Sequence, residues 1–165
     1  MSKVYLLNTI TESHQFNVIN EDIKNWDYGI IYGKGLFKKH TGHYAHIELS
    51  LSKSSEDLSG NWIVWNTSNN HLPDYIGHKP FVEKVLSFFI NYLSGLKGEK
   101  VKLTIEINDG SYHEVDTRPK DYENATIFAL INAFDKNSKM ISNNDLEIIK
   151  NCKLNAEKNQ AENNK

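Results

Sequence analysis

The sequence has few of the residues that crosslink or anchor a chain, and this limits what the protein can be. Among 165 residues Cys152 is the only cysteine, which excludes an internal disulfide and a cysteine-rich zinc site. No apolar run approaches 18 residues, and the N-terminus carries no apolar signal segment. We therefore expect a cytoplasmic protein with no membrane partner, long enough to bury one core unaided.

Motifs for catalysis and nucleotide binding are also missing. The chain has no glycine-rich phosphate loop, no Gly-x-Ser-x-Gly elbow and no His-Glu-x-x-His. We therefore expect no GTP or other nucleotide, no cofactor and no enzymatic activity. A small enzyme that uses His113, beside Glu114 and Asp116, as a general base is the catalytic alternative. That chemistry also requires an orienting partner and an oxyanion site, which the sequence does not indicate.

The chain has no surplus of positive charge, since its net charge is −2. This argues against a broadly basic nucleic-acid surface, because phosphate binding requires an excess of Lys and Arg. One region differs from the rest: it places four lysines against Glu48, with three interleaved histidines, namely Lys34, Lys38, Lys39, Lys53, His40, His43 and His46. It predicts a modestly basic hairpin. A metal site is not favoured, because histidines at odd separations point to opposite strand faces and no Cys or carboxylate completes a ligand set.

Apolar periodicity predicts the order of the secondary structure. Strands are expected at residues 28–39, 44–51, 62–65 and 101–108, with two further strands in the apolar runs at 4–7 and 16–19. Helices are expected from Pro80 to Gly98, from Pro119 to about Ala133 and beyond Ser142, with a helical turn at 21–26. This order predicts an α+β fold with one sheet and helices packed on one face. The last residues, rich in Asn, Gln, Glu and Lys, are expected to be disordered.

The segment 101–116 is the most informative stretch. Its first half alternates apolar and polar residues, as a strand with one buried face does, and Asp109-Gly110 is expected to end it in a tight reversal. A hairpin at that point would place Glu106 opposite His113. Alternatively, residues 109–117 form a loop, and Asp116 or Thr117 caps a helix that contains Pro119. We favour the loop, because a cap before Pro119 is a definite helix start.

Residues 109–116, Asp-Gly-Ser-Tyr-His-Glu-Val-Asp, resemble the distal loop of domain IV of bacterial elongation factor G, the translocation GTPase. Residues 37–42 with 44–47, then 72–76 and 82–84, match further segments in the family's order. The resemblance covers residues 28–136, which leaves residues 1–27 as a strand-rich N-terminal addition and 137–165 as a C-terminal helix with a disordered tail. The chain lacks the GTPase domain and the longer Gly-Arg-Gly insertion that the family usually has after Gly42.

The resemblance implies a fold like domain 2 of ribosomal protein S5, with a left-handed βαβ crossover and a protruding tip. It implies a non-catalytic module that contacts the ribosome or structured RNA. The expected tip-loop contacts are Asp109, Gly110, Ser111, Tyr112, His113 and Glu114, and the basic hairpin adds Lys38, Lys39, His40 and His43, with Arg118 on phosphate. The alternative is an immunity-type protein that neutralises a single partner protein such as a toxin, which suits a small acidic chain.

Overall fold

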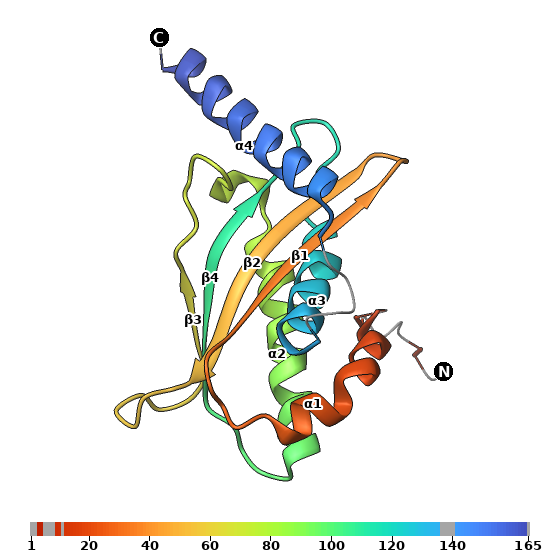
Figure 1. The fold of residues 1–165 in the computed structure, drawn as a ribbon, viewed down its shortest axis with the longest axis vertical. Helices are drawn as coiled ribbons and strands as arrows, with labels where there is room; N and C mark the ends of the chain where they lie inside the picture. Colours follow the sequence, from red (N-terminus) through yellow and green to blue (C-terminus); the bar gives the residue numbers. More distant parts are fainter. Residues whose placement is uncertain (1–2, 5–8, 11, 136–140, 165) are drawn as a thin grey trace.

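The computed structural model describes residues 3–4, 9–10, 12–135 and 141–164 (Figure 1). Its strands are β1 (Ile31–Lys39), β2 (His43–Lys53), β3 (Trp62–Trp65) and β4 (Leu103–Ser111). Its α-helices are α1 (Asn20–Asn25), α2 (Lys79–Lys97), α3 (Asp121–Phe134) and α4 (Asn143–Asn163), and two 3₁₀ segments are η1 (Ser13–Ile19) and η2 (Asp74–Ile76). The strands predicted at 28–39, 44–51 and 62–65 and the helices predicted after Pro80 and Pro119 are confirmed.

The four strands form one mixed sheet in the order β1-β2-β4-β3. β1 pairs antiparallel with β2, β2 pairs antiparallel with β4, and β3 runs parallel to β4. In Figure 1 β3 and β4 both run upward, β4 lies to the right of β3, and the connecting helix α2 lies behind the sheet. The crossover is therefore left-handed, the rare hand for a βαβ unit. The hand implied by the resemblance is confirmed.

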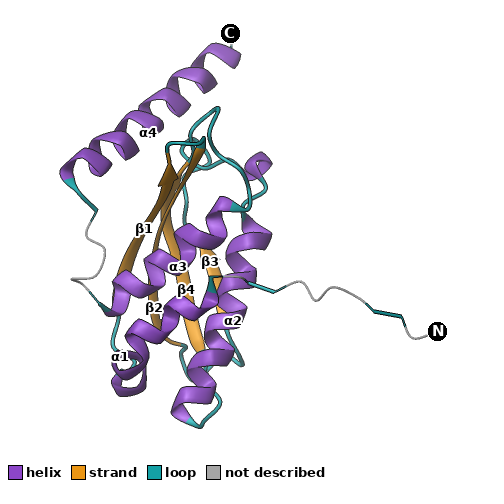
Figure 2. Cartoon of the chain, turned by 90° about the vertical axis from the view of Figure 1, so that its right-hand side faces the viewer, coloured by secondary structure: helices purple, strands orange, loops and turns teal. Residues whose placement is uncertain are grey.

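The core lies between the sheet and the helices α2 and α3, which pack on the same face (Figure 2). β1 can lie against α3 because it carries glycine where the two backbones meet. A Cβ atom added to Gly35 would lie 1.9 Å from the carbonyl oxygen of Ala125, and one on Gly33 would lie 1.9 Å from that of Ala129. Ala125, Ala129 and Ala133 of α3 thus lie directly against the two glycines of β1.

The N-terminal region is helical, so the strand predicted at residues 16–19 is wrong. Those residues belong to η1, where Phe16 and Ile19 are both fully buried. Residues three apart share a face of a 3₁₀ helix, so both side chains can face the core. Phe16 contacts the rings of Phe88 and Phe89 on α2. The helical turn expected at 21–26 is confirmed as α1, whereas the strand expected at 4–7 falls largely outside the described residues.

The predicted reversal at Asp109-Gly110 is wrong, because β4 runs through both residues to Ser111. A register shift opposite Glu48 and Leu49 accommodates this segment. Gly110 is not needed for positive φ but for packing: a Cβ atom there would lie 2.5 Å from Cδ2 of Leu72. The loop therefore spans only residues 112–120. The helix begins at Asp121, beyond Pro119, so the cap expected at residue 116 or 117 is also wrong.

Helix α4 continues to Asn163 and does not end in the disordered tail expected after residue 153. It begins with a capping box in which Ser142 and Asp145 satisfy each other's backbone N–H groups. α4 lies on the face of the sheet opposite α2 and α3 (Figure 2). Ala156, in its second half, is buried. Within the described ranges, no helix combines the length and apolar character that crossing a membrane requires.

Candidate nucleic-acid interface at the tip

One end of the sheet carries a compact tip, formed by the β1–β2 turn and the loop of residues 112–120. The backbone N–H of Tyr44 donates to the carbonyl of Asp116 at 3.1 Å, and Thr117 Oγ1 donates to the carbonyl of Tyr44 at 2.8 Å. Nδ1 of His43 lies 2.8 Å from a carboxylate oxygen of Asp121, at the start of α3. These contacts hold the turn and the loop side by side, although about 70 residues separate them in the chain.

Exposed cations gather at this tip. We define the tip surface as Lys39, His40, His113, Arg118 and Lys120, all of which are exposed or partly exposed. Lys39, Arg118 and Lys120 form no ion pair with any residue that the structure describes. Nζ of Lys39 lies 5.4 Å from the ring centre of Phe37, which leaves its charge at the surface. Three cations are therefore available to an anionic partner.

Of the four hairpin residues expected to bind a partner, Lys38 and His43 are engaged within the protein. Lys38 forms an ion pair with Asp145 of α4, although its side chain stays partly exposed. His43 hydrogen-bonds Asp121 and packs edge-on against Phe37, so its side chain is only 24% exposed. Among the hairpin residues expected to bind, Lys39 and His40 thus remain the freest.

The structure divides the predicted tip-loop residues into two groups. Asp109, Gly110, Ser111 and Tyr112 belong to β4 or lie beneath the loop, and only the side chain of Asp109 is partly exposed. Burial and a hydrogen bond to the hydroxyl of Tyr75, 3.1 Å away, raise the pKa of Tyr112 to about 12. The expectation that these four residues form an exposed loop is wrong, because the strand does not turn at Gly110. His113 and Glu114 do reach the surface.

His113 is oriented by its own loop. Its Nδ1 accepts a hydrogen bond from the backbone N–H of Asp116 at 3.2 Å and a longer one from that of Val115 at 3.4 Å. A neutral ring in this geometry carries its proton on Nε2. Nδ1 is thus used as an acceptor within the loop, and Nε2 is the ring nitrogen left to bind a partner. Val115, beside it, is 82% exposed, so the loop presents an apolar side chain as well as an imidazole.

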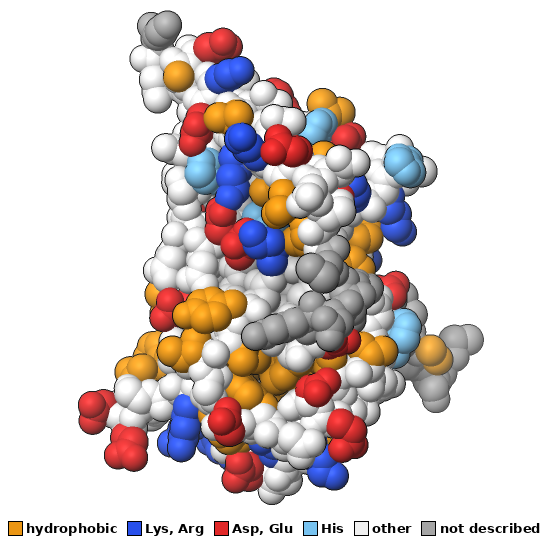
Figure 3. Space-filling model, in the orientation of Figure 1, with side chains coloured by type: hydrophobic (Ala, Val, Ile, Leu, Met, Phe, Trp, Pro, Cys, Tyr) orange, Lys and Arg blue, Asp and Glu red, His pale blue; other side chains and the backbone are white. Residues whose placement is uncertain are grey.

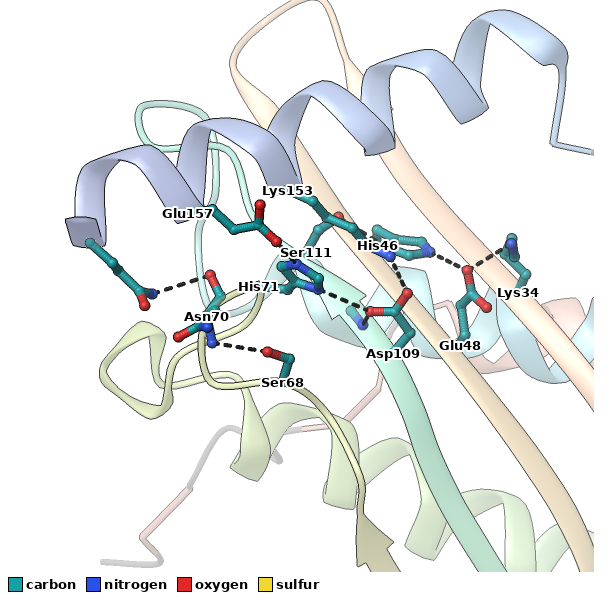
Figure 4. Close-up of polar contacts among 12 residues, drawn as sticks. Lys34, His46, Glu48, Ser68, Asn70, His71, Asp109, Ser111, Lys153 and Glu157 are labelled. Carbon is teal, nitrogen blue, oxygen red and sulfur yellow. Dashed lines mark hydrogen bonds and ion pairs between the residues drawn. The ribbon is translucent and has the colours of Figure 1, made fainter. Parts of the chain in front are cut away.

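A chain of polar side chains runs beneath the tip, buried from Tyr44 to His46 and partly exposed at Glu48 and Lys34 (Figure 4). The hydroxyls of Tyr44 and Ser111 lie 2.7 Å apart, and Ser111 Oγ lies 3.0 Å from Nδ1 of His46. Nε2 of His46 then lies 3.1 Å from Glu48, which also pairs with Lys34 at 2.7 Å. Sequence reasoning missed this cluster. His46 and Glu48 are two residues apart on β2 and therefore share a face of the sheet, which the sequence alone could have indicated. That Ser111 of β4 lies beside them depends on the register shift between the two strands, which the sequence does not show.

The electrostatics of this chain favour a neutral His46 and an ionised Glu48. Burial lowers the pKa of His46, since the charged ring would lose its water. Burial alone would raise the pKa of Glu48, but hydrogen bonds from His46 and Lys34 outweigh it and lower the pKa to about 2. Serine, histidine and glutamate also occur in hydrolase triads, yet Ser111 is fully buried and its hydroxyl bonds Tyr44. In this arrangement no substrate can reach the hydroxyl.

Polar contacts fasten α4 over the tip end of the sheet. Lys153 pairs with Asp109, and Glu157 accepts from Nε2 of His71 at 2.7 Å (Figure 4). Asn159 donates to Glu114 at 3.1 Å. The side-chain amide of Gln160 donates to the carbonyls of residues 69 and 70, at 3.3 and 3.1 Å.

A cleft of about 230 Å³ remains between α4 and the tip loop, lined by His113, Glu114 and Cys152 among others. Burial raises the pKa of Cys152, so at neutral pH the side chain is a thiol and not an activated thiolate. Among the described residues, no group of three or more His, Cys, Asp or Glu side chains is placed to hold a metal ion. The cleft therefore offers hydrogen-bonding groups, without an evident nucleophile.

Comparison with known proteins bears on the fold alone. No protein-family model matches the chain, and no curated protein matches it. A crystal structure of a protein from Thermus thermophilus superposes with a TM-score of 0.51 at 20% sequence identity. The match covers 65% of this chain but only 16% of that protein. The chain is thus α+β, a four-stranded mixed sheet with helices packed on one face, and it fits the fold of domain 2 of ribosomal protein S5.

Proposed function

We propose that the protein is a cytoplasmic, non-catalytic module that binds structured RNA, such as ribosomal RNA, through its tip surface. The observation that carries the proposal is the convergence of Lys39, Arg118 and Lys120 at one end of the fold, without acidic partners among the described residues. Phosphate groups attract such unpaired cations, and releasing the counterions around the RNA favours binding. The resemblance of residues 109–116 to the distal loop of elongation factor G domain IV also supports RNA binding at this end of the molecule.

The rest of the protein limits where RNA can bind. The net charge is −2, so a phosphate backbone is repelled by much of the surface and attracted only locally. His40 and His113 add hydrogen-bond donors beside the three cations, and Val115 can contact a base or sugar. Contacts of this kind position a domain on RNA without requiring any catalytic group.

Charge removal at the two ends of the sheet tests the proposal. A triple variant, Lys39→Ala/Arg118→Ala/Lys120→Ala, removes three positive charges from the tip. A control, Lys53→Ala/Lys100→Ala/Lys102→Ala, removes three exposed lysines from the opposite end. Binding is measured by fluorescence anisotropy on ribosomal RNA fragments and by sedimentation with ribosomes, from about 50 to 200 mM salt, the range over which phosphate contacts weaken most visibly. Circular dichroism confirms that each variant is folded.

We expect the tip variant to weaken binding at least tenfold and to reduce the slope of log affinity against log salt by about two units. The reduction follows from three phosphate contacts at roughly 0.7 to 0.9 units each. The control should leave the slope unchanged. Equal losses in both variants would mean that net charge alone attracts RNA. Absence of binding at the lowest salt concentration, together with stoichiometric capture of one protein from the native cell, would instead favour the immunity-type alternative.

A further inference from the structure

The outer edge of β3 carries backbone groups that no described residue satisfies. β3 is the last strand of the sheet, and only its inner edge pairs, with β4. The N–H of Asn66, just after β3, donates to the carbonyl of Ile107 on β4. This bond shows which residues of β3 direct their backbone N–H and C=O groups towards β4 and which direct them away. Because this direction alternates from one residue to the next, Trp62 and Val64 direct their backbone groups towards β4. Ile63 and Trp65 therefore direct theirs outward, as an edge strand that can accept another strand does.

Apolar side chains accompany this open edge on both faces. Trp62 is 46% exposed and Val64 is 39% exposed on the face opposite the helices. Figure 3 shows hydrophobic side chains over the part of this face where Figure 1 draws β3. On the helix side, a groove of about 230 Å³ runs between β3 and α2, and Ile63, Leu86 and Ile90 contribute to its walls. Isolated apolar residues are common on surfaces, but here they flank free backbone donors and acceptors.

The charged side chain that lines the groove is acidic. Glu83 lines the groove, is exposed, and forms no ion pair with a residue that the structure describes. Lys79, whose Nζ lies 5.2 Å from the ring centre of Trp65, is not part of the lining and is paired with Asp74.

Glu106, the register partner of Val64, adds a carboxylate on the other face, where it accepts a hydrogen bond from Asn66. A chain that pairs with β3 thus meets apolar walls with a carboxylate on each side. These carboxylates favour lysine or arginine in the partner and disfavour acidic residues.

We propose that the edge of β3 and the β3–α2 groove bind an extended, apolar and basic peptide segment of a partner protein, by adding it as a fifth strand. The segment's backbone pairs with Ile63 and Trp65, its alternate apolar side chains enter the groove, and a flanking Lys or Arg lies near Glu83. Backbone pairing supplies affinity in this mode, and the groove and the carboxylates supply selectivity. The site is distant from the tip, so it is independent of the RNA-binding proposal.

Two blocked nine-residue peptides test the proposal, each alternating valine and threonine, with lysine at both ends of one and glutamate at both ends of the other. Titration into isotope-labelled protein is followed by NMR. We expect the lysine peptide to shift the amide signals of Ile63 and Trp65 and to slow their hydrogen exchange. The glutamate peptide should bind about fivefold more weakly, in keeping with exposed charge pairs.

Three variants distinguish binding at this site from nonspecific hydrophobic binding elsewhere on the protein. Ser87→Phe places a ring in the groove from an exposed position and should weaken the lysine peptide at least tenfold. Asn91→Phe, one turn further along α2, adds the same ring at an exposed position that does not line the groove. It should leave binding unchanged. Glu83→Lys should reverse the preference between the two peptides.

The proposal is overturned if neither amide responds to the lysine peptide at millimolar concentration, or if Ser87→Phe and Asn91→Phe behave alike. It is also overturned if both amides are already protected without peptide and the protein sediments as a dimer. That result would identify a second copy of this chain as the strand that covers the edge.

Discussion

His78 is a buried imidazole whose two ring nitrogens have no hydrogen-bond partner among the described residues. Its ring lies between those of Trp65 and Tyr122, each 5.4 Å away between ring centres. Burial lowers its pKa from 6.5 to about 4, because the charged ring would lose its water in an apolar site. His78 thus remains neutral in the folded protein at a pH where the unfolded chain is protonated.

We predict that His78→Phe makes the protein less sensitive to acid. Because the pKa of His78 is lower in the folded protein than in the unfolded chain, this residue costs no stability above about pH 6.5. The free energy of unfolding falls as the pH drops from there towards 4. At about pH 5 the loss from this residue is about 2 kcal/mol. Urea denaturation at neutral pH and at about pH 5 should show a smaller loss in the variant. The buried His46 is present in both proteins, and His40→Phe at the exposed turn is the control. Equal losses in wild type and variant would contradict the prediction.

At the residue scale, the sequence predicted which side chains are exposed better than it predicted which side chains contact one another. The positions of Lys39 and His40 followed from the hairpin pattern, because a turn between two amphipathic strands must be solvated. Gly110 was misread because glycine marks a turn more often than a tight packing site. Only the position of Leu72, far away in sequence, shows why a side chain is excluded there. The cluster around His46 was likewise hidden, since it depends on a register that periodicity alone cannot give.

At the scale of elements, α4 shows how a polar sequence can still form a docked helix. A helix was expected beyond Ser142, but the composition after residue 153 predicted disorder because that part offers few apolar side chains. The structure orders the helix through side-chain amides and ion pairs directed at the loop of residues 69–71 and at β4. Likewise, the apolar run at residues 16–19 is only four residues long, which is too short for its hydrophobic periodicity to distinguish a strand from a 3₁₀ helix. In both cases tertiary contacts decide, and a local pattern does not contain them.

We predict that ending the chain at residue 153 destabilises the protein, contrary to what the composition suggests. The truncation removes the buried Ala156, the contact of Glu157 with His71 and the amide bonds of Gln160. These are partly exposed contacts, so the loss should be about 1–2 kcal/mol, or roughly 4 °C in melting temperature. Removing only residues 161–165 retains all three contacts and is the matched control. If both truncations melt like the full chain, α4 contributes nothing beyond residue 153.

At the scale of the whole molecule, the region of residues 28–136 does not contain the complete core. Phe16, Ile19 and Ile23, which precede that region, are fully buried with the side chains of α2 and α3. Burying three side chains of this size contributes about 5–9 kcal/mol. That figure is comparable to the total stability of a small domain, about 5–15 kcal/mol. The N-terminal segment is therefore an integral layer of the fold.

We predict that a chain lacking residues 1–27 does not fold cooperatively. The deletion exposes the rings of Phe88 and Phe89, which Phe16 covers in the full chain. Thermal denaturation should lose its sharp transition, and a dye that binds exposed apolar surface should fluoresce more strongly than with the full chain. In the intact chain, Phe16→Ala should cost about 3–5 kcal/mol, because it empties a buried site. Val18→Ala, two residues away but 68% exposed, should change stability by less than about 0.5 kcal/mol. A truncated chain that melts as sharply and at the same temperature as the full one would show that residues 28–165 hold a sufficient core.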